Sequence, residues 1–142
     1  MKLLVYGTLR TYHRNHQYLG LDEACDVVGE VKVPGFSMYD HAWFPCAVED
    51  PKGEIVGELL NVHDHSIWRH LDQYEGYNQY AQDDSLFVRR TYEFADIGNA
   101  YMYIYHKPLP TNAVKIEGGD WKAYVERSEK QRAGRSIALL AR

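Results

Sequence analysis

Two short stretches decide how this chain is interpreted: Leu3-Leu4-Val5-Tyr6-Gly7-Thr8-Leu9 and Leu71-Asp72-Gln73-Tyr74-Glu75-Gly76-Tyr77. The first is typical of a buried strand over Leu3–Tyr6 that ends in a glycine turn. Such a turn exposes backbone N–H groups that can hold a carboxylate. The second places one acid, Glu75, between two tyrosines at the end of a predicted helix. Together they predict a small pocket with an anion cradle and one carboxyl group in aromatic surroundings.

The size and composition predict a single soluble globular domain. The chain has 142 residues, of which 45% are hydrophobic and 25% charged, and this length is enough to bury a core. The net charge of −4, without a dominant basic block, argues against a nucleic-acid partner. No apolar stretch approaches the roughly 20 residues that a membrane span requires. The N-terminal apolar run is also too short for a signal peptide.

The two cysteines, Cys25 and Cys46, form neither a CxxC motif nor the disulfide pattern of a secreted protein. This usage predicts a reducing, cytoplasmic setting in which both thiols are structural.

Hydrophobic patterning predicts an α+β fold, a compact mixed β-sheet or small β-barrel with two or three flanking helices. Strands are expected over Leu3–Tyr6, Ala24–Tyr39, Phe44–Val48, Ile55–Val62, Tyr80–Tyr92 and Ala100–Tyr105. The clearest turn signal, Asp50-Pro51-Lys52-Gly53, is expected to join two of these strands as a hairpin. In the last strand, alternation places Tyr101, Tyr103 and Tyr105 on one face.

Three helical segments are predicted. They are one turn over Asn15–Leu19, a helix that begins at Asp64 or Ser66 and ends at Gly76, and a last helix from about Trp121 to Gln131 with Asp120 as its N-cap.

The domain is expected to cover residues 1–132, followed by a basic and apolar C-terminal tail over residues 133–142. A frayed, solvated terminus is the favoured interpretation of this tail. The alternative is contact with an anionic partner or a second subunit, so both a monomer and a homodimer remain open.

The chain resembles the γ-glutamylcyclotransferase-like superfamily, in particular its AIG2-like (γ-glutamylamine cyclotransferase-like) branch. The resemblance follows the order of the chain over most of its length, and the first matching segment is Tyr6–Arg10. The other segments are Asn15 with Leu19, Gly35–Tyr39, Phe44-Pro45, Val56–Leu60, Leu71–Tyr77, Ala100–Tyr105 and Ile116–Trp121. The sequence departs from the family pattern at Cys46, where alanine is usual, and at Gln82, where arginine is frequent.

The resemblance implies an enzyme that releases 5-oxoproline and a free amine or amino acid from a γ-glutamyl compound by attack of the substrate's own α-amine. It implies that Glu75 is the catalytic general base and acid. No metal or other cofactor is implied, and the partner is a small-molecule substrate rather than nucleic acid or a membrane.

The same resemblance assigns substrate binding to four residues. The backbone N–H groups of Gly7, Thr8 and Leu9 are expected to bind the substrate α-carboxylate, and Tyr6 is expected to shape the pocket wall. The alternation of the last strand adds Tyr101 and Tyr103 as substrate-binding candidates, since either could reach the site from that strand, and both are expected to line the core or the pocket.

Two other functions remain open at this point: a non-catalytic module that binds or senses a γ-glutamyl or 5-oxoproline-like ligand, and amide hydrolysis by water that Glu75 activates. Arg10 is interpreted as an exposed loop residue, and the alternative is that it adds a charge partner for the substrate. His63, Asp64, His65 and His70 do not match a common zinc spacing and are interpreted as solvated.

Overall fold

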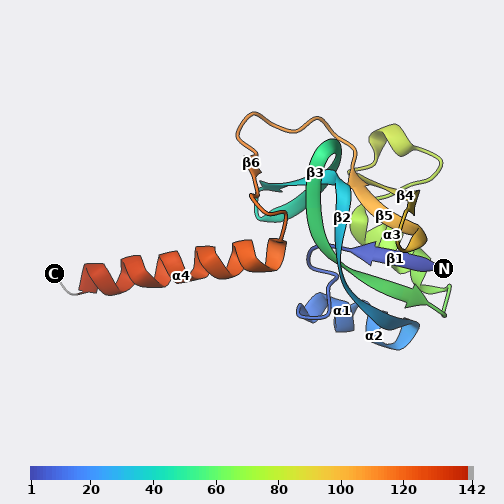
Figure 1. Cartoon of the computed structure of the whole chain (residues 1–142), viewed down its shortest axis with the longest axis horizontal. Helices are drawn as coiled ribbons and strands as arrows, with labels where there is room; N and C mark the ends of the chain where they lie inside the picture. The colour runs from blue at the N-terminus through green and yellow to red at the C-terminus, as the bar shows by residue number, and fades with distance from the viewer. Residues whose placement is uncertain (141–142) are drawn as a thin grey trace.

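A computed structural model describes residues 1–140 of the chain and confirms the α+β class. One six-stranded sheet contains antiparallel and parallel pairs, and helices flank it (Figure 1). The strands are β1 (Lys2–Val5), β2 (Cys25–His41), β3 (Phe44–Val62), β4 (Phe87–Phe94), β5 (Gly98–Tyr105) and β6 (Val114–Lys115). The helices are α1 (Arg14–Tyr18), α2 (Leu21–Ala24), α3 (Ile67–Glu75) and α4 (Trp121–Leu140), with a 3₁₀-helix, η1, over Gln82–Asp84.

Strand β1 lies inside the sheet and joins its two antiparallel units. The strand order is β4-β5-β1-β3-β2-β6, so β1 has a neighbour on each side. Val5 at the end of β1 pairs with Glu58 of β3, and Leu3 pairs in parallel with Tyr101 of β5. The buried apolar side chains of β1 suit a strand covered on both faces. The loop that follows Val5 therefore starts from a fixed point of the sheet.

Successive residues of the strands alternate between two apolar clusters on opposite faces. Tyr101 and Tyr103 of β5 contact one cluster and Met102 contacts the other, which confirms the predicted alternation. Leu71 of α3 packs into the cluster that contains Tyr103, whereas Trp121 of α4 packs into the cluster that contains Met102. Helix α3, which carries most of the second motif of the sequence, therefore packs on the same face of the sheet as Tyr101 and Tyr103.

The predicted hairpin turn at Asp50–Gly53 is wrong, because these residues lie inside β3 and both halves of β3 pair with β2. Asp50 does make the local contacts of a turn residue. Its carboxylate accepts hydrogen bonds from the Lys52 N–H at 3.0 Å and from the Ser37 hydroxyl at 2.5 Å. The register of β2 shifts opposite this segment, so the turn residues form a bulge within a continuous strand.

The turn that joins β2 to β3 lies instead at Ala42 and Trp43, whose φ angles are +51° and +72°. Two-residue hairpin turns with positive φ at both positions favour Asn-Gly. The sequence carries no such signal here, which explains why the pattern did not reveal this turn.

The predicted strand over Tyr80–Tyr92 begins only at Phe87. Ser85 ties the preceding segment into a turn, since its hydroxyl accepts a hydrogen bond from the Asn78 N–H at 2.9 Å and donates one to the Ala81 carbonyl at 3.1 Å. A side chain that satisfies backbone groups in this way competes with strand pairing.

Two predicted helix boundaries are confirmed, and one helix was missed. Gly76 ends α3 with a φ of +69°, a conformation that glycine adopts without steric cost. The Asp120 carboxylate accepts the Ala123 N–H at 3.2 Å and so caps α4. The short helix α2, directly after Gly20, was not predicted.

Helix α4 is longer than predicted and projects away from the sheet (Figure 1). It continues past Gln131 to Leu140, so residues 133–140 of the predicted tail belong to a helix. Residues 141 and 142 lie outside the described residues.

The start of α4 approaches β3 closely through Gly119. The Gly119 carbonyl accepts the Val56 N–H at 2.8 Å, and a Cβ atom at Gly119 would overlap the Glu54 carbonyl oxygen. Gly118 also has a positive φ, +83°, but apart from its chain neighbours no described atom lies within 4 Å of a Cβ placed there. A comparison of substitutions at these two neighbouring glycines therefore separates the cost of backbone strain from the cost of steric overlap.

We expect Gly119→Ala to lower the free energy of unfolding more than Gly118→Ala. Alanine at positive φ costs about 1 kcal/mol at either position, and the overlap at Gly119 adds roughly 1–3 kcal/mol. Urea unfolding of the two variants measures the difference. Equal losses would contradict the close approach of α4 to β3.

Candidate active site

A pocket of about 260 Å³ lies at the end of β1, between the loop that follows it and the C-terminal end of α3. It is lined by Leu4, Val5, Tyr6, Gly7, Thr8, Leu9, Phe44, Pro45, Tyr74, Glu75, Leu86, Phe87 and Tyr103. The two stretches of sequence that predicted a site thus meet at one pocket. Among these lining residues of the described chain, Glu75 supplies the one acidic or basic side chain.

The loop after β1 (residues 6–11), here called the substrate loop after the role that the resemblance implies, turns sharply at Gly7. The Arg10 N–H donates to the Gly7 carbonyl at 3.1 Å, which closes the turn. A Cβ atom at Gly7 would overlap the Pro45 ring, so the close approach of the loop to β3 requires glycine. In the described chain, the N–H groups of Gly7, Thr8 and Leu9 donate no hydrogen bond. They remain available to an anion in the pocket.

Glu75 is the last residue of α3, and its side chain is partly buried at the pocket. No hydrogen bond or ion pair joins its carboxyl group to another described residue. Burial raises the pKa of Glu75 from 4.5 to about 8, because desolvation disfavours the charged form and nothing nearby stabilises it. The carboxyl group can therefore exchange a proton near neutral pH.

Tyr6 and Tyr103 form the buried wall behind Glu75. The Tyr6 hydroxyl donates to the Tyr103 carbonyl at 2.6 Å. Burial, and next the negative charge of Glu75, raise the pKa of Tyr6 well above its usual value. Tyr6 is thus a neutral wall residue rather than an acid.

An ion pair outside the pocket holds α3 against β4. The Arg89 guanidinium binds both oxygens of Asp72, at 2.9 and 3.0 Å, and the Tyr103 hydroxyl donates to the same carboxylate at 2.6 Å. Asp72 lies one helical turn before Glu75 on α3, so this bidentate pair fixes the helix end that carries Glu75.

Tyr74 closes the pocket on the side of the substrate loop, a role that the sequence did not predict. Its hydroxyl lies 3.2 Å from the Thr8 hydroxyl and accepts a hydrogen bond from the Asn15 side chain at 3.0 Å. The position of Tyr74 next to Glu75 in the sequence is the signal that could have identified it as a pocket residue. Tyr77, the other flanking tyrosine, does not line this pocket.

Tyr101 is the predicted binding residue that does not line the pocket. Its ring packs against Trp68 at a centroid distance of 5.1 Å, and the Arg89 guanidinium lies 5.0 Å from its centroid. Tyr101 therefore supports the position of α3 rather than facing the cavity.

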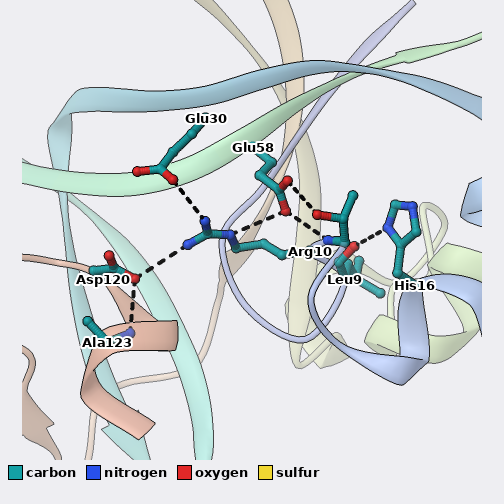
Figure 2. Close-up of polar contacts among 8 residues, drawn as sticks. Leu9, Arg10, His16, Glu30, Glu58, Asp120 and Ala123 are labelled. Carbon is teal, nitrogen blue, oxygen red and sulfur yellow. Dashed lines mark hydrogen bonds and ion pairs between the residues drawn. The ribbon is translucent and has the colours of Figure 1, made fainter. Parts of the chain in front are cut away.

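Arg10 is buried, not exposed as predicted, with 4% of its surface accessible. Its guanidinium lies among three carboxylates, those of Glu58, Asp120 and Glu30 (Figure 2). The sequence could not reveal this, since all three partners are distant along the chain.

The remaining reactive side chains point to no further centre. Among the described residues, no group of three or more His, Cys, Asp or Glu side chains could hold a metal ion. Cys25 and Cys46 are free and buried, and burial raises their thiol pKa values to about 11 and about 12. None of the described helices has the length and apolarity that crossing a membrane requires.

Comparison with solved structures shows the same fold in other proteins. A protein from Pyrococcus horikoshii superposes with a TM-score of 0.67 at 21% identity, over 91% of this chain and 97% of its own. Escherichia coli ytfP gives a TM-score of 0.65 at 24% identity, over 85% of this chain and 96% of its own.

Comparison of sequences identifies the family. The family model described as gamma-glutamyl cyclotransferase, AIG2-like, matches residues 3–123. A Vibrio cholerae protein named as a candidate gamma-glutamylcyclotransferase is 30% identical over 120 residues, which cover 84% of this chain and 93% of that protein. A gamma-glutamylcyclotransferase family protein of Citrobacter rodentium is 27% identical over 122 residues, which cover 85% and 95%. The chain therefore belongs to the AIG2-like γ-glutamylcyclotransferase family of enzymes.

Proposed function

We propose that this enzyme cyclises a γ-glutamyl amine or γ-glutamyl amino acid, releasing 5-oxoproline and the free amine or amino acid. One observation carries the proposal: the desolvated carboxyl group of Glu75 shares a small pocket with the N–H groups of Gly7, Thr8 and Leu9, and none of these groups has a hydrogen-bond partner among the described residues. A γ-glutamyl group carries an α-ammonium and an α-carboxylate, which match these two features in charge.

The reaction needs no nucleophile from the protein. The α-amine nitrogen of the substrate attacks the γ-carbonyl carbon, the new C–N bond closes a five-membered ring, and the amide C–N bond to the leaving group then breaks. Holding the chain in the cyclising conformation supplies the effective concentration of the nucleophile. The attacking nitrogen changes from an ammonium to a lactam N–H and so loses two protons, while the leaving nitrogen gains two. The protein must therefore bind and orient the substrate and assist this proton transfer.

Glu75 moves one of these protons in two steps. Its carboxylate accepts a proton from the α-ammonium so that the amine becomes nucleophilic, and the resulting acid donates it to the departing amine. The ring nitrogen releases its second proton to water after ring closure, and the released amine takes up a proton from water to become an ammonium. General acid–base catalysis of this kind contributes roughly 10²–10⁴-fold and works best when the pKa lies near the operating pH. A pKa of about 8 for Glu75 meets this condition.

The pocket size supports a small ligand. Its volume of about 260 Å³ lies below the roughly 300–1,000 Å³ of sites for drug-sized molecules. The γ-glutamyl portion fits this size, and the leaving portion would extend toward solvent. Specificity for the leaving group is then expected to depend on the surrounding loops.

We expect the purified protein to form 5-oxoproline from at least one member of a panel of γ-glutamyl amines and dipeptides, followed by NMR or mass spectrometry. Glu75→Gln keeps the shape of the side chain but cannot accept the proton, so turnover should fall by about 100-fold or more. Binding of 5-oxoproline should change little.

Glu93→Gln is the matched control, because Glu93 is exposed on β4 outside this pocket and its loss should leave turnover unchanged. Wild-type rates in Glu75→Gln would refute the assignment of Glu75. Release of free glutamate would indicate hydrolysis, and saturable binding without any product would indicate a binding module.

The pKa of Glu75 also makes a prediction about stability. The folded pKa is about 8 and the ordinary value 4.5, so between these pH values the folded state holds a proton that the unfolded state has released. Stability then falls as pH rises from about 4.5 to about 8 and levels off above. In Glu75→Gln the side chain at position 75 does not titrate, so the stability of this variant does not show that decrease.

We therefore expect the melting temperature of Glu75→Gln to equal that of the wild type near pH 4 and to exceed it by a growing margin up to about pH 8. Thermal denaturation at several pH values measures this margin. A difference that is independent of pH would show that Glu75 has an ordinary pKa.

A further inference from the structure

Glu58 of β3 closes the substrate loop at both ends. Its backbone pairs with Val5, the last residue of β1 before the loop. Its carboxylate accepts the Thr11 N–H at 2.8 Å and the Thr11 hydroxyl at 2.7 Å, where the loop ends. The entry and the exit of the loop are therefore fixed to one residue.

Arg10 reinforces this closure without reaching the pocket. Its Nε lies 3.3 Å from Glu58, and its other nitrogens lie 3.4 Å from Asp120 and 3.6 Å from Glu30 (Figure 2). The side chain is absent from the pocket lining, and its charge is directed to these carboxylates. Arg10 can therefore affect a ligand only through the shape of the loop.

A third contact orients the centre of the loop. His16 of α1 is buried, and its Nδ1 lies 2.7 Å from the Leu9 carbonyl oxygen (Figure 2). Together with the Arg10 N–H bond to Gly7, this contact restrains the carbonyl groups of Gly7 and Leu9. In the part of the chain that the structure describes, the N–H groups of Gly7, Thr8 and Leu9 are left without a protein acceptor.

From this geometry we propose that Arg10 and Glu58 are positioning residues, which hold the N–H groups of Gly7, Thr8 and Leu9 in the arrangement that binds a carboxylate. The inference rests on the proposed function for the identity of that carboxylate, the α-carboxylate of a γ-glutamyl group or of 5-oxoproline. It adds that the binding power of the loop is set by a buried ion pair outside the pocket.

The carboxyl group of Glu58 stays ionised at neutral pH. Burial by itself would raise the pKa of Glu58, but the two Thr11 hydrogen bonds and the charge of Arg10 outweigh it and lower that pKa below its usual value. The effect on the loop is therefore independent of the titration of Glu75.

The carboxylates around Arg10 are not equivalent. The Glu58 side chain has 11% of its surface exposed, whereas that of Glu30 has 67% exposed. Exposed ion pairs contribute little, while a buried pair fixes geometry and is costly to break. Glu30 therefore offers a matched control on the same guanidinium.

The kinetic signature follows from what the loop binds. The α-carboxylate is present in the substrate, the transition state and the product, so the loop binds all three alike. Loss of such uniform binding raises KM and leaves kcat unchanged. Loss of Glu75 affects the proton transfer and lowers kcat instead.

The test compares Arg10→Lys and Thr11→Val with Glu30→Gln in the full chain. Arg10→Lys keeps the charge but loses the planar fork, and Thr11→Val removes one of the two bonds to Glu58 at an exposed position. The first readout is the Kd for 5-oxoproline from NMR titration. The second is KM and kcat for whichever γ-glutamyl compound the wild type converts.

Arg10→Lys should weaken 5-oxoproline binding and raise KM by about tenfold or more, since small misplacements of binding groups have effects of this size. The kcat of Arg10→Lys should stay within about twofold of the wild type. Thr11→Val should raise the Kd and KM by a smaller factor than Arg10→Lys. For Glu30→Gln, both the Kd and KM should differ from the wild type by less than about twofold. Should Arg10→Lys fail to fold, Thr11→Val carries the same test.

Unchanged Kd in both Arg10→Lys and Thr11→Val, or a fall in kcat at constant KM, would overturn the inference. A wild type that binds 5-oxoproline but converts no γ-glutamyl compound would refute the proposed function, while the Kd comparison would still decide the role of Arg10. A wild type that neither binds 5-oxoproline nor converts any γ-glutamyl compound would overturn both.

Discussion

The pairing of Glu58 with the substrate loop is the constraint on which the rest of the site depends. Ordinary strand pairing holds the backbone of Glu58 beside Val5, and its side chain holds Arg10 and Thr11. Burying two opposite charges costs desolvation that only good geometry and further hydrogen bonds offset. The Thr11 bonds supply that offset, so the charged pair and the loop shape stabilise each other.

In this site the charged residues that fix the structure are separate from the residue that is proposed to transfer the proton. Charged groups hold its two halves from outside: Glu58 and Arg10 hold the substrate loop, while Asp72 and Arg89 hold the end of α3. Among the described residues that line the pocket between them, Glu75 carries the one carboxyl group. Because none of these lining residues carries a positive charge, burial keeps the pKa of Glu75 high.

This arrangement explains why a destabilising group persists in the fold. A cation beside Glu75 would stabilise its charge, lower its pKa and fix it as a carboxylate. It would then be a poor donor to the departing amine. The cost of desolvation is therefore tied to the proposed exchange of a proton, a relation often found at active sites.

The sequence by itself determined the local features: the strand before Gly7, the end of α3 at Gly76, the Asp120 cap and the presence of Glu75 beside Tyr74. These depend on contacts within a few residues. Only the tertiary structure decided that Asp50–Gly53 is a bulge, that Tyr101 turns to Arg89, and that Arg10 is buried. Register and burial arise from partners far apart in the chain, as Arg10 and Asp120 are, 110 positions apart. No local pattern records such a partner, and the charge of Arg10 alone favours the surface.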